Sequence, residues 1–280
     1  MEEKQQARQE RQKIRQEKKQ RRAKGCFRLI LLSVVLASAL LILWVFRSPE
    51  GTLLSNGLRS NPYSPEDFAL RSGYVTCLTG PSRRGLDVSE HQGQIDWEQV
   101  RAAGFDFAFV RIGYRGYSVG DIYPDDFALA NLEGAKAAGL QVGAYFYSQA
   151  ISPEEAAEEA AWCLDFLANR QLDLPLVYDW EYVSPSARTG SMDKAAVTAC
   201  AQTFCQAIES AGYQPMLYFN THIARDLLDL PALRQYPFWL AQYKDQMDYP
   251  YQVDFWQYTE EGSIPGIEGD VDIDLMFLYE

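Results

Sequence analysis

The chain has 280 residues, of which 47% are hydrophobic and 13% aromatic, so it can form one large core domain with an appendage. Residues 1–28 hold eleven Lys or Arg and four Glu and carry +7, and because the whole chain carries −12, residues 29–280 carry −19. Such an acidic body repels phosphate groups, which argues against nucleic-acid binding.

Residues 29–46 read LILLSVVLASALLILWVF, an apolar stretch of 18 residues without a charge. A transmembrane helix needs roughly 20 mostly apolar residues, with about 17 as the lower limit. The cations of residues 1–28 predict a cytoplasmic N-terminus, and hence a single-pass cell membrane protein whose body faces the cell wall. A cleaved signal peptide is the competing interpretation, because the Ala-Ser-Ala at residues 37–39 resembles a cleavage site. However, cleavage there would leave part of the apolar stretch on the mature chain.

Residues 47–83 are rich in Ser, Pro, Asn, Gly and Arg and show no sustained period. This composition predicts an extracellular linker, with a short ordered piece near residues 74–78.

The predicted extracellular part has four cysteines: Cys77, Cys163, Cys200 and Cys205. Disulfides are permitted outside the cell, and three pairings are open. Cys163 and Cys200 lie in helical patterns and fit equally well as small core residues. The chain has only two histidines, His91 and His222, and no Cys/His cluster with zinc spacing, so the sequence predicts neither a metal site nor a cofactor.

From residue 84 onward, short β-rich runs alternate with helical patterns, which indicates parallel strands. The clearest helix start has Ser152 as its N-cap, followed by Pro153. Further helices are predicted over residues 192–211 and 222–228. After five strand–helix units, three strands follow with only short connections: FWLAQY, DFWQYT and VDIDLMF.

This order predicts an α/β fold over residues 84–280, an irregular TIM-like barrel of the (β/α)5(β)3 kind. An open, doubly wound sheet is the alternative. It would normally have a glycine-rich turn after the first strand, and GxGxxG is absent here.

The strand LVYDWEYV, residues 176–183, carries Asp179 and Glu181 two positions apart, so both side chains point to the same side. Burying unpaired carboxylates costs several kcal/mol, which favours a functional interpretation of this pair. Because the C-terminal ends of barrel strands build the active site, we expect Asp87 and Asp272 to join the pair there.

Two structural interpretations of the other acids remain open. Asp87 alone fits equally well as the cap of a turn after its strand. Asp270, Asp272 and Asp274 alternate in sequence and also fit a solvated acidic edge.

Aromatic and amide side chains near the predicted strand ends are candidates for substrate binding. They are Tyr114, Tyr145, Tyr147, Tyr218, Trp239, Gln242, Tyr243 and Gln257. Aromatic rings stack on the apolar faces of sugars, although core packing is expected for about half of such rings. Carboxylates and aromatic rings at one end of a barrel, with no nucleotide motif, favour glycoside hydrolysis.

Several short segments follow one another in a recognisable order: GLDVSEHQGQIDWEQV, FVRIGY, GAYFYS, LPLVYDWEYV, MLYFN, FWLAQY, FWQYT and GIEGDVDIDLMF. Through them, residues 84–277 resemble the glycoside hydrolase family 25 lysozymes, the Chalaropsis-type N-acetylmuramidases. Two positions depart from the family pattern. Phe146 stands where His is common, and Asp274 stands where the closing motif V-D-x-N commonly has Asn.

The resemblance implies cleavage of the β-1,4 bond between N-acetylmuramic acid and N-acetylglucosamine in peptidoglycan. Glu181 would be the general acid and then the base, which requires a pKa above the ordinary value of about 4.3. Asp179 would stay ionised and stabilise the substrate's own 2-acetamido group as it attacks the anomeric carbon, with direct attack by a carboxylate as the alternative. Asp87 and Asp272 would shape the electric field and bind substrate.

The expected partners are therefore peptidoglycan glycan strands, bound by a monomer that remodels the wall of its own cell. Two other functions stay open: a non-catalytic glycan-binding protein on the same barrel, and another barrel glycosidase of the chitinase kind.

Overall fold

The computed structural model describes residues 51–279, so the predicted cytoplasmic tail and membrane span lie outside the described part of the chain. Within residues 51–279, no helix is both long and apolar enough to cross a bilayer.

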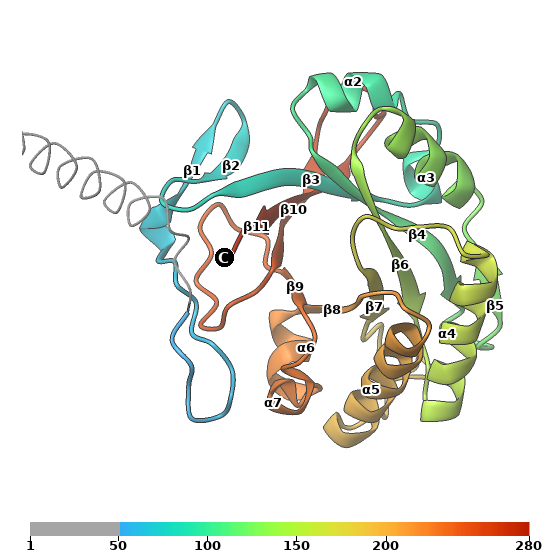
Figure 1. Cartoon of the computed structure of the whole chain (residues 1–280). Coiled ribbons are helices and arrows are strands. Elements are labelled where there is room, and N and C mark those ends of the chain that lie inside the picture. Colours follow the sequence, from blue (N-terminus) through green and yellow to red (C-terminus); the bar gives the residue numbers. More distant parts are fainter. Residues whose placement is uncertain (1–50, 280) are drawn as a thin grey trace, which may run out of the picture. The chain divides into compact units, whose positions relative to one another are not determined.

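Eight strands close into the predicted barrel (Figure 1). They are β3 (Ser82–Val88), β4 (Phe107–Arg115), β6 (Gln141–Ser148), β7 (Leu176–Trp180), β8 (Pro215–Asn220), β9 (Phe238–Ala241), β10 (Phe255–Gly262) and β11 (Val271–Phe277). The sheet order is β3-β11-β10-β9-β8-β7-β6-β4, and β3 pairs with β4 to close the ring. A short strand, β5 (Ile122–Pro124), is added antiparallel to β4.

The strand β11 runs antiparallel to both of its neighbours, β10 and β3, so the parallel pairing indicated by the alternation of strands and helices does not extend to it. Only residues 263–270 connect β10 to β11, which is too short for a crossover helix, so the chain turns back as a hairpin. As a result the start of β11, with Asp272, lies beside the end of β3, with Asp87.

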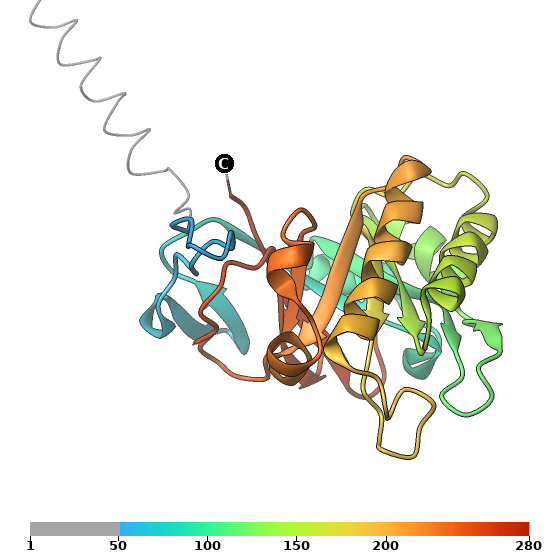
Figure 2. The ribbon, with the colours of Figure 1, turned by 90° about the horizontal axis from the view of Figure 1, so that it is seen from below.

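Helices cover the outside of most of the barrel: α2 (Trp97–Ala102), α3 (Ala128–Ala137), α4 (Pro153–Leu167), α5 (Lys194–Ser210), α6 (Thr221–Asp226) and α7 (Leu230–Leu233). The cap predicted for α4 is confirmed, because the Ser152 side chain accepts the N–H of Glu155. The helix α5 begins after Asp193, whose carboxylate accepts the N–H of Ala196 at 2.9 Å. Figure 2 shows α4 and α5 side by side on the outer face.

Two loops project beyond the C-terminal ends of the strands on the same side of the barrel (Figure 2). They are residues 116–121, after β4, and residues 181–193, after β7. The backbone N–H of Arg188 donates to the carbonyl of Tyr117 at 3.1 Å and so ties the two loops together.

The interior of the barrel is closed at the N-terminal ends of the strands by aromatic rings. Phe107 and Phe109 pack edge to face, and each also meets Phe255. A Cβ atom at Gly85 would collide with the Phe107 ring, and one at Gly143 would collide with the Phe109 ring. Because this end is filled, polar chemistry inside the barrel is confined to the opposite, C-terminal end.

The segment before the barrel differs from the predicted linker. It contains a short helix, η1 (Pro65–Asp67), and an antiparallel hairpin of β1 (Phe68–Arg71) and β2 (Tyr74–Cys77), the latter confirming the predicted ordered piece. Phe68 packs edge to face on Trp256, and Tyr63 stacks on Phe277. These residues cover the outer face of β10 and β11, where no helix follows. The apolar residues of the segment before the barrel lack a regular period, so the sequence pattern did not reveal this packing.

The cysteines of the described part, Cys77, Cys163, Cys200 and Cys205, are buried free thiols. Within residues 51–279 no group of His, Cys, Asp or Glu is arranged to hold a metal ion.

Candidate active site

Asp179 and Glu181 lie at the C-terminal end of β7. Asp179 pairs with Tyr147 of β6 and Tyr218 of β8, and its side chain is only 5% exposed inside the barrel. Trp180 points outward, and its indole N–H donates to the carbonyl of Ala150 at 3.0 Å. Glu181 follows the last strand residue and is partly exposed. The two carboxyl groups are close enough for each other's charge to matter.

The antiparallel pairing of β3 and β11 brings three further carboxyl groups to the same end. Asp87 lies directly opposite Asp272, and Asp274 is two residues further along β11. Asp87 is 4% exposed, Asp274 is fully buried and Asp272 is partly exposed. Asp270, in contrast, lies on the surface. We call Asp87, Asp179, Glu181, Asp272 and Asp274 the acidic cluster.

A chain of hydrogen bonds fixes one side of the acidic cluster. Gln257 donates its amide N–H to Asp87 Oδ2 at 2.8 Å. The amide oxygen of Gln257 accepts the hydroxyl groups of Tyr218 at 2.8 Å and Tyr243 at 3.1 Å. Because the hydroxyl groups of Tyr218 and Tyr243 both donate to the amide oxygen of Gln257, the amide nitrogen faces Asp87. Trp239 donates its indole N–H to Asp274 Oδ1 at 2.8 Å.

The other predicted binding residues fall into two groups. Tyr145, Tyr218 and Trp239 are buried inside the barrel, where the Trp239 ring stacks on Phe109 with centroids 4.7 Å apart. Tyr114, Tyr147 and Tyr243 are partly or largely open to solvent. The predicted set thus mixes rings that shape the interior with rings that are open to solvent.

Two singled-out residues do not join the acidic cluster. The Gln242 side chain accepts the backbone N–H of Asp248 at 3.1 Å and lies on the far side of its loop. Phe146 is buried on the outer face of the barrel, against the Trp162 ring.

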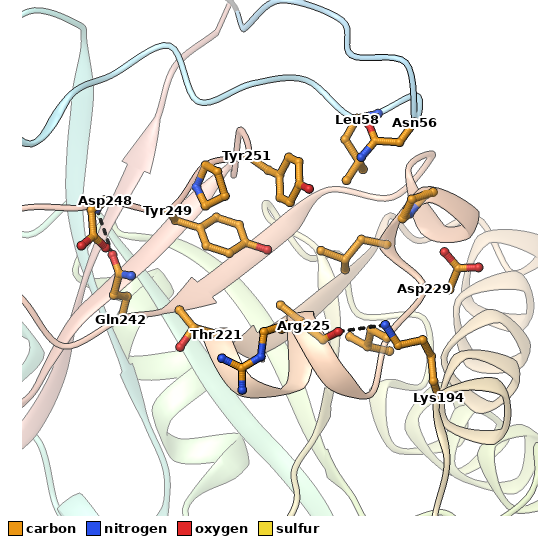
Figure 3. A pocket seen from close by; sticks show the side chains of 15 residues that line it. Asn56, Leu58, Lys194, Thr221, Arg225, Asp229, Gln242, Asp248, Tyr249 and Tyr251 are labelled. Carbon is orange, nitrogen blue, oxygen red and sulfur yellow. Dashed lines mark hydrogen bonds between the residues drawn. The ribbon is translucent and has the colours of Figure 1, made fainter.

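A separate cavity of about 710 Å³ lies where Gln242 points (Figure 3). It is lined by Tyr249 and Tyr251 on one side and by Lys194 and Arg225 on the other. Lys194 donates to the carbonyl of Arg225, and the guanidinium of Arg225 is paired with Asp226. No carboxyl group of the acidic cluster lines this cavity.

Burial is the main influence on the proton affinities of the acidic cluster. It raises the pKa of Asp87, Asp179 and Asp274 well above the usual range of a carboxyl group, and neighbouring carboxylates raise these pKa values further. Burial, with the negative charges of Glu260 and Glu181, raises the pKa of Asp272 to about 7. The pKa of Glu181 is also raised, by burial and then by Glu260.

These directions change one expectation. Asp179 was expected to stay ionised beside a protonated Glu181, but the deeper burial of Asp179 and the adjacent charge of Glu181 raise its own pKa strongly. Burial raises the pKa of both carboxyl groups, so burial alone does not single out Glu181 as the group that keeps the proton.

Arg111, which sequence reasoning overlooked, is the cation that opposes this effect. It lies on β4, and its positive charge lowers the pKa of both Asp179 and Tyr145. Its guanidinium is held by ion pairs to Asp125 at 2.8 Å and Glu90 at 3.1 Å. A single cation inside the apolar run FAFVRIGY was the signal that could have identified it.

Gln149 is a second residue that the sequence did not reveal. It is fully buried, and its amide N–H groups donate to the backbone carbonyls of Glu181 at 2.7 Å and Ser148 at 3.0 Å. The amide oxygen accepts the hydroxyl of Thr189 at 3.1 Å. Gln149 therefore fixes the backbone that carries Glu181.

We expect Gln149→Ala to lower kcat by roughly tenfold to a hundredfold, because a misplaced acid works poorly, and to destabilise the fold by about 1–3 kcal/mol. Turnover of peptidoglycan fragments, the substrate that the family resemblance implies, and urea unfolding measure the two effects. Gln206→Ala, at an exposed position on α5, is the matched control. An unchanged kcat would show that the backbone after β7 needs no help from Gln149.

The raised pKa values also predict how stability depends on pH. A group whose pKa is higher in the folded than in the unfolded protein keeps its proton longer in the folded state, so its contribution is lost as pH rises. For Asp272 the window runs from its ordinary value of 3.8 to about 7. The slope within it is at most about 1.4 kcal/mol per pH unit.

We therefore expect the unfolding free energy of Asp272→Asn to fall less between pH 4 and pH 7 than that of the unaltered chain. Urea unfolding at several pH values measures this difference. Asp126→Asn, at an exposed position, should keep the original dependence. Parallel curves for Asp272→Asn and the unaltered chain would contradict the raised pKa.

A family model described as "Glycosyl hydrolases family 25" matches residues 86–267. The chain is 28% identical over 194 residues to an autolytic lysozyme of Clostridium acetobutylicum, a match that covers 68% of this chain and 55% of that protein. It is 26% identical over 205 residues to lysozyme M1 of Streptomyces globisporus, covering 68% of this chain and 66% of that protein.

Among solved structures, the chain is similar to the modular autolysin LytC of Streptococcus pneumoniae in complex with a synthetic peptidoglycan ligand. The TM-score is 0.63 at 24% identity, and the match covers 75% of this chain and 52% of that one. At this identity the likeness shows a shared fold. This chain thus spans about half the length of LytC and of the clostridial relative.

Proposed function

Because the chain belongs to the glycosyl hydrolases of family 25, we propose that it is a lysozyme that hydrolyses the β-1,4 bond between N-acetylmuramic acid and N-acetylglucosamine in peptidoglycan. The names of its relatives, an autolytic lysozyme and lysozyme M1, support this activity. The observation that carries the proposal is the Asp179–Glu181 pair, held inside a barrel end with no ion pair to either carboxyl among residues 51–279.

The Asp179 carboxylate has hydrogen-bonding capacity that the described part of the chain does not use. Asp179 Oδ1 is buried and has no hydrogen-bond donor within residues 51–279. Asp179 as a whole is 5% exposed, and the 2-acetamido N–H of the muramic acid residue donates to its carboxylate. That bond favours ionised Asp179, because a hydrogen bond to the charged form lowers a pKa. Substrate binding therefore favours the state in which Asp179 is ionised and Glu181 keeps its proton.

The protonated Glu181 then acts as general acid. It protonates the glycosidic oxygen as the acetamido carbonyl oxygen of the same sugar attacks the anomeric carbon and expels the leaving sugar. Ionised Asp179 stabilises the positive charge that develops on the acetamido group. Glu181, now ionised, takes a proton from the water that opens the cyclic intermediate, and the configuration at the anomeric carbon is retained.

Products of a defined peptidoglycan distinguish this activity from its rivals. After incubation with the purified full chain and borohydride reduction, mass analysis should find reduced N-acetylmuramic acid at the new ends. New ends at N-acetylglucosamine, or cleavage of plain N-acetylglucosamine chains, would indicate a glycosidase of the chitinase kind. If no new ends formed, the lysozyme activity would be refuted, and a non-catalytic glycan-binding protein would be the remaining interpretation.

We also propose that the chain is a single-pass membrane protein with its N-terminus in the cytoplasm and its barrel facing the wall. The support is the apolar stretch of residues 29–46 and the cations before it. Alkaline extraction of cell membranes tests this: a membrane-spanning chain stays in the pellet. Release of the chain, or a mature N-terminus within residues 37–50, would favour the cleaved signal peptide.

A further inference from the structure

Asp274 is the member of the acidic cluster to which neither the family resemblance nor the proposed reaction gives a role. It lies in the middle of β11, is fully buried and accepts the Trp239 N–H at Oδ1. Its other oxygen, Oδ2, is buried without a hydrogen-bond donor within residues 51–279. Leaving a buried polar group unsatisfied costs about 1–3 kcal/mol, and more if it is charged. A hydrogen at this carboxyl would remove that cost.

Asp87 is the group that can share such a hydrogen. The register of β3 and β11 pairs Asp87 with Asp272 and Gly85 with Asp274, so Asp87 and Asp274 are diagonal neighbours on the inner face. Gly85 has no side chain to separate them, and a side-chain hydrogen bond with Asp87 lowers the pKa of Asp274 against the larger effect of burial. Two carboxylates in such contact repel strongly if both are ionised, and one proton between them relieves the repulsion.

The surrounding donors leave room for one proton. Asp87 receives an N–H from Gln257, and Asp274 receives an N–H from Trp239. Gln257 cannot turn its amide to serve Asp274, because Tyr218 and Tyr243 hold its oxygen. Each carboxyl group thus accepts one hydrogen bond from a fixed N–H group. Between the two carboxyl groups, only a proton bound to one of them can form a hydrogen bond.

We propose that Asp87 and Asp274 share one proton, and that Asp274 is a positioning residue that holds Asp87 at the C-terminal end of the barrel. Trp239 anchors Asp274 from β9, and Gln257 holds Asp87 from β10. The proton also limits the negative charge of the interior.

Most titratable neighbours of the Asp87–Asp274 pair are acidic groups. Asp272 of β11 and Asp179 of β7 face Asp87, together with the phenols of Tyr145, Tyr218 and Tyr243. Arg111, which faces Asp179 and Tyr145, is already paired with Asp125 and Glu90. Burial raises the pKa of both Asp87 and Asp274, in agreement with a proton that is retained.

Net charge tests the shared proton without any reference to activity. Asp274→Asn keeps an acceptor for Trp239 and supplies an N–H to Asp87, so the pair carries one negative charge before and after the change. We expect its electrophoretic mobility under native conditions at pH 7 to equal that of the unaltered chain. Asp126→Asn, at an exposed position, should shift the mobility by one charge. An equal shift for Asp274→Asn would mean that both carboxyls are ionised, and would overturn the proposal.

Kinetics test the positioning role, and this part rests on the proposed function. Asp274→Leu removes the hydrogen bond to Asp87 and should lower kcat by about tenfold to a hundredfold. In Asp274→Asn, which still donates a hydrogen bond to Asp87, most of that loss in kcat should be absent. In Asp87→Asn the loss in kcat should remain, because this change removes the negative charge of the pair. Unchanged turnover in Asp274→Leu, or equal loss in Asp274→Asn, would refute the role. If the unaltered chain proves inactive, the charge measurement still decides whether the proton is shared.

Discussion

Glu181→Gln is expected to lower kcat on peptidoglycan by about 10²- to 10⁴-fold, the range that a positioned general acid and base contributes. Glutamine has nearly the shape of glutamic acid but gives no proton to the leaving oxygen and takes none from water. Because Glu181 is partly exposed and the hydrogen bond from Gln149 goes to its backbone, the fold should be unaffected. The release of reducing ends, with sugar binding measured separately, checks both statements.

A matched control for this change is Glu133→Gln on α3, at an exposed position outside the barrel interior. It should leave turnover unchanged. If Glu181→Gln retained full turnover, the acid would have to be sought elsewhere in the acidic cluster, with Asp272 as the partly exposed candidate.

Asp179→Asn should lower kcat by about 10²- to 10³-fold, the usual effect of removing a group that stabilises developing charge. The same substitution should not destabilise the fold. Burial raises the pKa of Asp179, so the charged form is penalised in the unliganded protein, and a neutral amide removes that penalty. We therefore expect the unfolding free energy in urea at pH 7 to be unchanged or higher.

This separation of activity from stability distinguishes a catalytic from a structural carboxylate. A loss of several kcal/mol in Asp179→Asn would assign the residue to holding the fold. Full activity would remove it from the reaction. Asp126→Asn, measured in the same way, gives the baseline for an exposed aspartate.

The barrel could be predicted from the sequence because its units are local. Each apolar run is followed by its own helix signal, and the clearest, Ser152 before Pro153, caps α4 as expected. The direction of β11 could not be read in this way, since it depends on which strands it meets and on the short connection before it. The same holds for residues 51–83, whose scattered aromatic rings find partners on β10 and β11 far along the chain.

The acidic cluster was predictable where spacing alone decides orientation. Asp179 and Glu181 are two apart, and one strand presents both to the same side. Asp274 has the same spacing from Asp272, but Asp270 continues the alternation, so the sequence also fitted a solvated acidic edge. Only the closure of β11 on β3 buries Asp274. Arg111 and Gln149 act on the acidic cluster from other strands or loops, and no local pattern reports such contacts.

The first and last strands of the barrel, β3 and β11, are antiparallel partners, and this pairing sets where the chain enters and leaves. Ser82 at the start of β3 pairs with Phe277 at the end of β11, so the chain enters and leaves at the end filled by Phe107 and Phe255. Sequence added before β3 or after β11 thus joins the barrel on the side remote from the carboxyl groups. In this topology, modules added at either terminus leave the end with the acidic cluster unobstructed.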